Sequence, residues 1–219
     1  MNFTFVNSLI FYTKILLLSI RFVCKFRKFL HVFFFYNKLK FERAVFKMNS
    51  IKLNNIYLTC LNSGFLPRNL AKTFLNANEN QLDYLVKKNV LTKNRAIIFS
   101  KVNTYYTLSP NMLKLFRSRK FYIYKSDSSQ LEHDYVLSRL FLEASDYNKM
   151  SWKNETELKK IYGKNTTTSD GLFITKNKKI IGVEVLTSTY TPDYIEKKKI
   201  FLENNCDDYI LINVNDIIK

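Results

Sequence analysis

Two acidic residues in the last third of the chain have the type and spacing that metal-dependent chemistry requires. Asp170 precedes the mostly apolar run 171–175, and Glu184 lies inside the apolar run 180–186. The polar turn 176–179 predicts a hairpin, whose antiparallel strands would place the two carboxylates side by side. Such oxygens bind Mg²⁺, which lowers the pKa of bound water and neutralises charge developing on a phosphate. The pair therefore predicts a site that cleaves phosphodiester bonds.

Neighbouring residues of a predicted helix could complete this site. A helix expected over 128–144 carries Glu132, a candidate third oxygen ligand, and His133, the nearest base or orienting group. Glu155 is a looser candidate. A simpler interpretation stays open, in which Glu184 only binds a neighbouring lysine.

The elements over 128–219 read helix, strand, strand, strand, helix, strand. Pro192 opens the second helix, expected over 191–204, and residues 209–214 are apolar and β-branched enough for a buried strand. A helix that crosses between strands implies a mixed sheet with helices packed on it, so the fold class is α+β.

The middle of the chain predicts a nucleic-acid-binding module. Three helices and two extended runs are expected, over residues 54–62, 66–74, 78–89, 96–99 and 104–108. Leu66, Leu70 and Phe74 would form one buried stripe of the second helix. Helix, helix, helix, hairpin is the order of a winged helix, whose third helix enters the major groove while its hairpin touches phosphates.

The predicted contacts to DNA lie on the third helix and the first wing strand. They are Asn80, Tyr84, Lys87, Lys88, Arg95 and Lys101. In the alternative interpretation the lysines form a solvated face and the helices a dimerisation unit. A basic linker follows over 113–127, and it could track phosphates or only connect the parts.

A family resemblance rests on two short motifs. Ser169-Asp170-Gly171-Leu172-Phe173-Ile174, followed after a hairpin by Gly182-Val183-Glu184-Val185-Leu186, resembles the acidic core of PD-(D/E)xK nuclease-like domains. With the preceding helical module, the order is similar to that of the replication-relaxation family of mobile elements. The resemblance spans about 56–214 and implies a metal-dependent nuclease fold joined to a DNA reader.

The motif departs from the family pattern at two positions. Ser169 replaces a proline, and Leu186 replaces the lysine that would position water or stabilise the transition state. In the family this lysine can come from the next helix, which assigns the role to Lys197 or Lys198. The alternative is that these lysines only form a solvated helix face.

Composition limits the classes of function. The net charge of +17 favours a polyanionic partner, either nucleic acid or an anionic membrane surface. The four glycines lack the spacing of a phosphate-binding loop. Two histidines are too few for a multi-histidine metal site. Three dispersed cysteines suggest neither a disulfide framework nor a zinc knuckle, so a reducing, cytoplasmic location is expected.

The first 47 residues form an apolar and basic extension. Residues 3–20 are just short of a membrane-spanning length and contain a lysine, and a basic run and a second apolar stretch extend to residue 36. Membrane association through residues 3–36 and a leader or packing helix before Met48 remain equal alternatives.

Four segments result: the extension 1–47, the winged-helix domain 48–112, the linker 113–127 and the nuclease-like domain 128–219. We expect a DNA-binding protein of a mobile element or plasmid, which as a Mg²⁺-dependent endonuclease or nickase would act in replication or mobilisation. Mg²⁺ is expected only if the protein is catalytic. The alternatives are a non-catalytic regulator on a degenerate nuclease scaffold and a membrane-associated basic protein.

Overall fold

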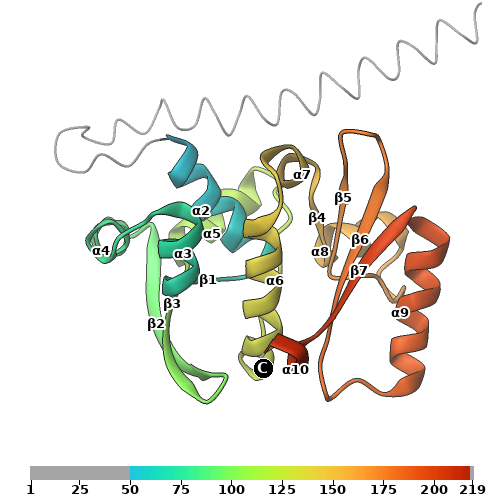
Figure 1. Cartoon of the computed structure of the whole chain (residues 1–219). Helices are drawn as coiled ribbons and strands as arrows, with labels where there is room; N and C mark the ends of the chain where they lie inside the picture. Colours follow the sequence, from blue (N-terminus) through green and yellow to red (C-terminus); the bar gives the residue numbers. More distant parts are fainter. Residues whose placement is uncertain (1–49, 218–219) are drawn as a thin grey trace, which may run out of the picture. The chain divides into compact units, whose positions relative to one another are not determined.

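Residues 50–217 of the chain are described by a computed structural model (Figure 1). They form an α+β fold with two small sheets, of which one is mixed, and this confirms the predicted fold class at that level. The predicted extension over 1–47 lies outside the described residues. Between residues 50 and 217, no helix combines the length and the apolar character that crossing a membrane requires.

The first sheet is built by the middle of the chain and is antiparallel, with strand order β1-β3-β2. Its elements are α2 (Ser50–Ser63), β1 (Leu66–Pro67), α3 (Arg68–Leu75), α4 (Glu79–Lys87), β2 (Leu91–Ile98) and β3 (Lys101–Leu108). Strands β2 and β3 form a long hairpin, visible in green in Figure 1.

Capping and turn residues set the boundaries of these elements. The Asn78 side chain accepts the Gln81 N–H at 2.9 Å and the Gln81 side chain accepts the Asn78 N–H at 3.2 Å, a capping box that begins α4. Phe99 and Ser100 have φ values of 52° and 60°, as a two-residue hairpin turn requires. Both strands are longer than the runs predicted from the sequence, because β2 begins at Leu91 and β3 at Lys101.

The predicted stripe of the second helix is wrong in part. Leu66 pairs with Tyr106 in the sheet, so α3 begins only at Arg68. Phe74 is 38% exposed, whereas Leu75 is buried. The helix therefore turns a different face to the core than a helix starting at Leu66 would.

The second sheet has the order β4-β5-β6-β7, with β6 and β7 parallel and the other pairs antiparallel. Its strands are β4 (Lys153–Asn154), β5 (Gly171–Ile174), β6 (Ile180–Leu186) and β7 (Asp208–Asn213). Helix α9 (Pro192–Asn205) makes the crossover from β6 to β7 (Figure 1). A Cβ at Gly182 would collide with Leu202 of α9, so glycine here allows the helix to approach the strand.

Helix α6 (Leu131–Glu143) connects the two sheets, since it contacts α3, β1 and β2 as well as β6. Its apolar residues share a core with the second sheet, formed by Val136, Leu137, Phe141, Trp152, Phe173, Val183 and Val185. On its other side, Ser138 Oγ donates to the Phe65 carbonyl at 2.8 Å. The remaining helices are α5 (Pro110–Ser118), η1 (Ser128–Gln130), α7 (Asp146–Ser151), α8 (Glu155–Tyr162) and α10 (Val214–Ile217).

Candidate functional site

Asp170 and Glu184 lie opposite each other across β5 and β6. The strands pair with Gly171 opposite Val183, so Asp170 and Glu184 form the next pair along the ladder. The Asp170 N–H donates to Glu184 Oε2 at 3.2 Å, and the Val185 N–H donates to Asp170 Oδ2 at 2.8 Å. Both side chains are buried. The structure therefore brings together the two carboxylates, as the hairpin pattern predicts.

Lys198 of α9 reaches both carboxylates. Its Nζ lies 2.9 Å from Glu184 Oε1, donates to Glu184 Oε2 at 3.1 Å and lies 3.6 Å from Asp170 Oδ1. Lys198 is 1% exposed, whereas Lys197 is exposed on the surface of α9. Of the two lysines predicted for the position that Leu186 leaves empty, only Lys198 therefore reaches the site.

His133 joins the same group from α6. Its Nε2 lies 2.9 Å from Asp170 Oδ2 and its Nδ1 lies 3.0 Å from Asp134 Oδ1. Asp134, which sequence reasoning missed, also accepts hydrogen bonds from Tyr124 at 3.0 Å and from Ser126. We call His133, Asp134, Asp170, Glu184 and Lys198 the buried charged cluster.

Burial and neighbouring charges set the protonation of the cluster. Burial opposes the imidazolium form of His133, but Asp170 and Asp134 outweigh it and raise its pKa to about 10. Burial also opposes ionisation of Asp170, yet His133 and Lys198 hold its pKa below the ordinary value. For Glu184, burial and then the charge of Asp170 raise the pKa to about 8, although Lys198 lowers it. Near neutral pH, His133 is therefore a cation and Asp170 an anion.

The carboxylate oxygens of Asp170 and Glu184 are the type of ligand that a hard divalent cation prefers. Glu184 Oε1 is buried and accepts no hydrogen bond, because Lys198 Nζ, although 2.9 Å away, lies off the required direction. Among described residues, Asp170 Oδ1 contacts only Lys198. Both of these oxygens lie within ion-pair distance of Lys198, so a bound cation would share them with this ammonium group. Mg²⁺ commonly completes two such ligands with water and substrate phosphate.

Glu132, the predicted third metal ligand, lies elsewhere. Its Oε1 accepts the backbone N–H of Phe99 at 3.0 Å, at the turn of the β2–β3 hairpin. Successive residues of a helix point about 100° apart, so Glu132 cannot share the direction of His133. Within the described part of the chain, no three His, Cys, Asp or Glu side chains are grouped as a protein-only metal site would need.

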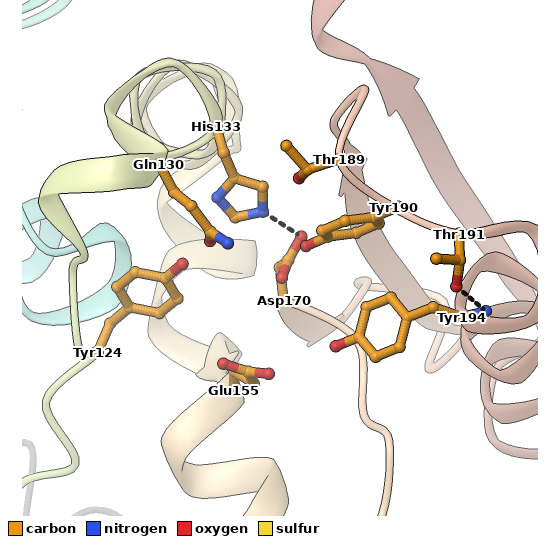
Figure 2. A pocket seen from close by; sticks show the side chains of 9 residues that line it. All are labelled: Tyr124, Gln130, His133, Glu155, Asp170, Thr189, Tyr190, Thr191 and Tyr194. Atoms are coloured by element: carbon orange, nitrogen blue, oxygen red, sulfur yellow. Dashed lines mark hydrogen bonds and ion pairs between the residues drawn. The ribbon is translucent and has the colours of Figure 1, made fainter.

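A pocket of about 460 Å³ opens beside Asp170 and His133 (Figure 2). Asn154 pairs with Gly171, and the Glu155 N–H donates to the Asp170 carbonyl at 3.1 Å, so Glu155 is the neighbour of Asp170 on its other side. All the lining side chains are polar or aromatic: Tyr124, Gln130, His133, Glu155, Asp170, Thr189, Tyr190, Thr191 and Tyr194. The pocket therefore suits a polar ligand.

The residues predicted to contact DNA lie on and just after α4 and on the β2–β3 hairpin. Asn80, Lys87 and Lys88 are exposed, as are Arg95 of β2 and Lys101 of β3. Tyr84 is half-buried, with Lys88 Nζ 5.6 Å from the centre of its ring. The five exposed side chains are accessible to a partner.

Acidic side chains of α4 are engaged in ion pairs that the sequence did not indicate. Glu79 binds Arg68 at 2.9 Å and Lys93 at 3.3 Å, and Lys93 also binds Asp83 at 2.9 Å. We call these four residues the surface ion-pair network. The network offsets the negative charge that α4 would otherwise present beside its lysines.

Comparison of the chain with protein-family models, with curated proteins and with solved structures gives no match.

Proposed function

We propose that residues 50–108 form a winged-helix module that binds DNA. Its support is the order helix, strand, helix, helix, hairpin together with the sheet order β1-β3-β2, in which the first short strand joins the wing. In such modules the third helix, here α4, enters the major groove and the hairpin follows the backbone. Asn80 and Tyr84 would then face bases, while Lys87, Lys88 and Arg95 would contact phosphates.

DNA binding by this module predicts a steep response to salt. Each phosphate contact releases counterions, so replacing Lys87 and Lys88 by Ala should lower the slope of log affinity against log salt by about 1 for each lysine. Fluorescence anisotropy with labelled duplex DNA measures this slope. Lys160→Ala, in an exposed position of α8, is the control and should leave the slope unchanged. A flat salt response of the wild type would contradict DNA binding.

We further propose that the C-terminal domain is a PD-(D/E)xK-like nuclease domain that nicks DNA of a mobile element or plasmid during replication or mobilisation. One observation carries this proposal: Lys198 of the next helix binds both Asp170 and Glu184, in place of the lysine missing at Leu186. The helix–sheet order and the α9 crossover agree with the resemblance seen in the motifs.

Four residues of the cluster have tasks in this reaction. Asp170 and Glu184 would hold Mg²⁺, which supplies an activated water and neutralises charge on the phosphate. Lys198 keeps a positive charge beside both carboxylates, where it can offset charge that develops in the transition state. His133 is a positioning residue, since its Nε2 binds Asp170 Oδ2. The other carboxylate oxygen, Oδ1, then lies on the side of Lys198.

Nicking of supercoiled plasmid tests this reaction. The full chain should convert it to the open circle with Mg²⁺ but not with EDTA, and Glu184→Gln should abolish conversion because it removes a charged ligand. Glu196→Gln, at an exposed position of α9, should keep the wild-type rate. Thermal unfolding shows that each variant is folded. Nicking that persists in Glu184→Gln would contradict the assignment.

A second candidate is a non-catalytic DNA-binding regulator on a degenerate nuclease scaffold. It is favoured by the ion pairs themselves, because Lys198 and His133 already neutralise the carboxylates without a metal. This candidate predicts salt-dependent DNA binding together with no nicking at any Mg²⁺ concentration, so the two measurements above decide between the candidates.

A further inference from the structure

The pocket beside Asp170 has aromatic walls on two sides. Tyr124 lines it from the segment before α6. Across the opening in Figure 2, Tyr190 lines it from the loop before α9 and Tyr194 from the first turn of that helix. The rings of Tyr190 and Tyr194 meet edge to face at 4.9 Å. Aromatic side chains at such positions provide faces on which a nucleobase can stack.

A buried cation supports this aromatic wall. Lys198 Nζ lies 5.5 Å from the centre of the Tyr194 ring and 6.0 Å from that of Tyr190. Cation–π contacts of this length hold a ring in place. The wall and the carboxylates are thus fixed by one lysine, and a ligand against the tyrosines would lie next to Asp170.

Two polar side chains of the pocket are available to a ligand. The Gln130 amide makes no hydrogen bond to any residue of the described chain. Glu155 uses Oε1 for Lys159, at 2.8 Å, and directs its carboxylate into the pocket (Figure 2). An amide that donates and accepts side by side matches the edge of a nucleobase, as glutamine does with adenine.

We propose that this pocket binds one unpaired nucleotide of DNA, its base against Tyr194 and hydrogen-bonded to Gln130. The inference rests on the proposed action of the domain on DNA and adds the class of substrate, a strand with an unpaired nucleotide. A paired base must be unstacked and unpaired before it can enter a pocket, whereas an unpaired base avoids most of this free-energy cost. The volume of about 460 Å³ lies within the range of roughly 300–1,000 Å³ typical of small-ligand pockets.

Binding of two DNA probes tests the proposal. We would compare a labelled duplex carrying a five-nucleotide single-stranded flap with the same duplex without the flap, using the full chain in EDTA so that no cleavage occurs. Because stacking contributes about 1–3 kcal/mol per base, the flap should bind about 5- to 150-fold more tightly. Equal affinity for both probes would overturn the proposal.

Pocket variants locate the source of this preference. Tyr194→Leu and Gln130→Leu should each reduce the flap preference while affinity for the blunt duplex stays the same. Tyr147→Leu is the matched control, because Tyr147 is 39% exposed on α7 and does not line the pocket. A flap preference that survives both pocket variants would also overturn the proposal. Nicking is measured separately, so loss of the nuclease assignment and loss of the flap preference are distinct results.

Discussion

The chain contains two groups of ion pairs that use the same kinds of residue at different depths. In the surface ion-pair network, the side chains of Arg68, Glu79, Asp83 and Lys93 are between 29% and 49% exposed. In the buried charged cluster, the side chains of His133, Asp134, Asp170, Glu184 and Lys198 are at most 3% exposed. The distances are similar, since the shortest contact is 2.9 Å in both groups.

The difference in burial separates an adaptable surface from a fixed site. Water screens the surface pairs, so they contribute little to stability and their side chains can rearrange. The buried charges have no water to replace a lost partner, so each depends on the others and shifts the pKa of its neighbours. Similar kinds of ion pair thus form an adaptable group of charges on the surface of α4 and a rigid group of charges between α6, β5, β6 and α9.

The same substitution in each group gives the largest expected contrast. Lys198→Met leaves the Glu184 and Asp170 carboxylates buried without their shared cation, and should lower the free energy of unfolding by about 3–5 kcal/mol. Lys93→Met should change the urea midpoint only slightly, because the Glu79 and Asp83 carboxylates stay in water. Urea unfolding followed by circular dichroism measures both.

A double variant sharpens this contrast. When Glu184→Leu accompanies Lys198→Met, a buried ion pair is replaced by apolar groups, so much of the lost stability should return. Equal losses for Lys198→Met and Lys93→Met would show that burial does not distinguish the two groups.

The buried cluster also predicts a pH-dependent effect on stability in EDTA. Folding raises the pKa of Glu184 from 4.5 to about 8 and that of His133 from 6.5 to about 10. The folded state therefore binds more protons, and stability is lost as pH rises through these windows. The slope should be steepest between pH 6.5 and 8, where both windows overlap.

Urea unfolding at a series of pH values checks this slope. His133→Gln should remove the part of the decline between pH 8 and 10 and keep the part due to Glu184. A profile that is flat from pH 6.5 to 10 in the wild type would contradict the proposed protonation of the cluster.

The central hairpin of the site could be predicted because strands repeat every two residues. A polar turn between two apolar runs determines the pairing, and the pairing determines that Asp170 faces Glu184. The same local rules failed where contacts between distant parts of the chain determine the bounds of an element. The start of α3 depends on the pairing of Leu66 with Tyr106, which belongs to a strand far along the chain.

The helical residues of the site could be only partly predicted. Lys197 and Lys198 are adjacent, and only the packing of α9 against Gly182 determines which one turns inward. The same applies to α6, where Asp134 is buried by Tyr124 and Ser126 while Glu132 turns to the hairpin. Tyr124 lies ten residues before Asp134 in the sequence. No periodic pattern of residue types links the two, so the sequence did not indicate their contact.

The rate of plasmid nicking by Lys198→Met, compared with Lys197→Met, tests the central claim most directly. If Lys198 replaces the lysine missing at Leu186, Lys198→Met should nick about 10²- to 10³-fold more slowly, while Lys197→Met keeps the wild-type rate. Adding Leu186→Lys to Lys198→Met should restore nicking, which separates a lost cation from a lost fold. Equal rates for the two single variants, with both proteins folded, would contradict the account.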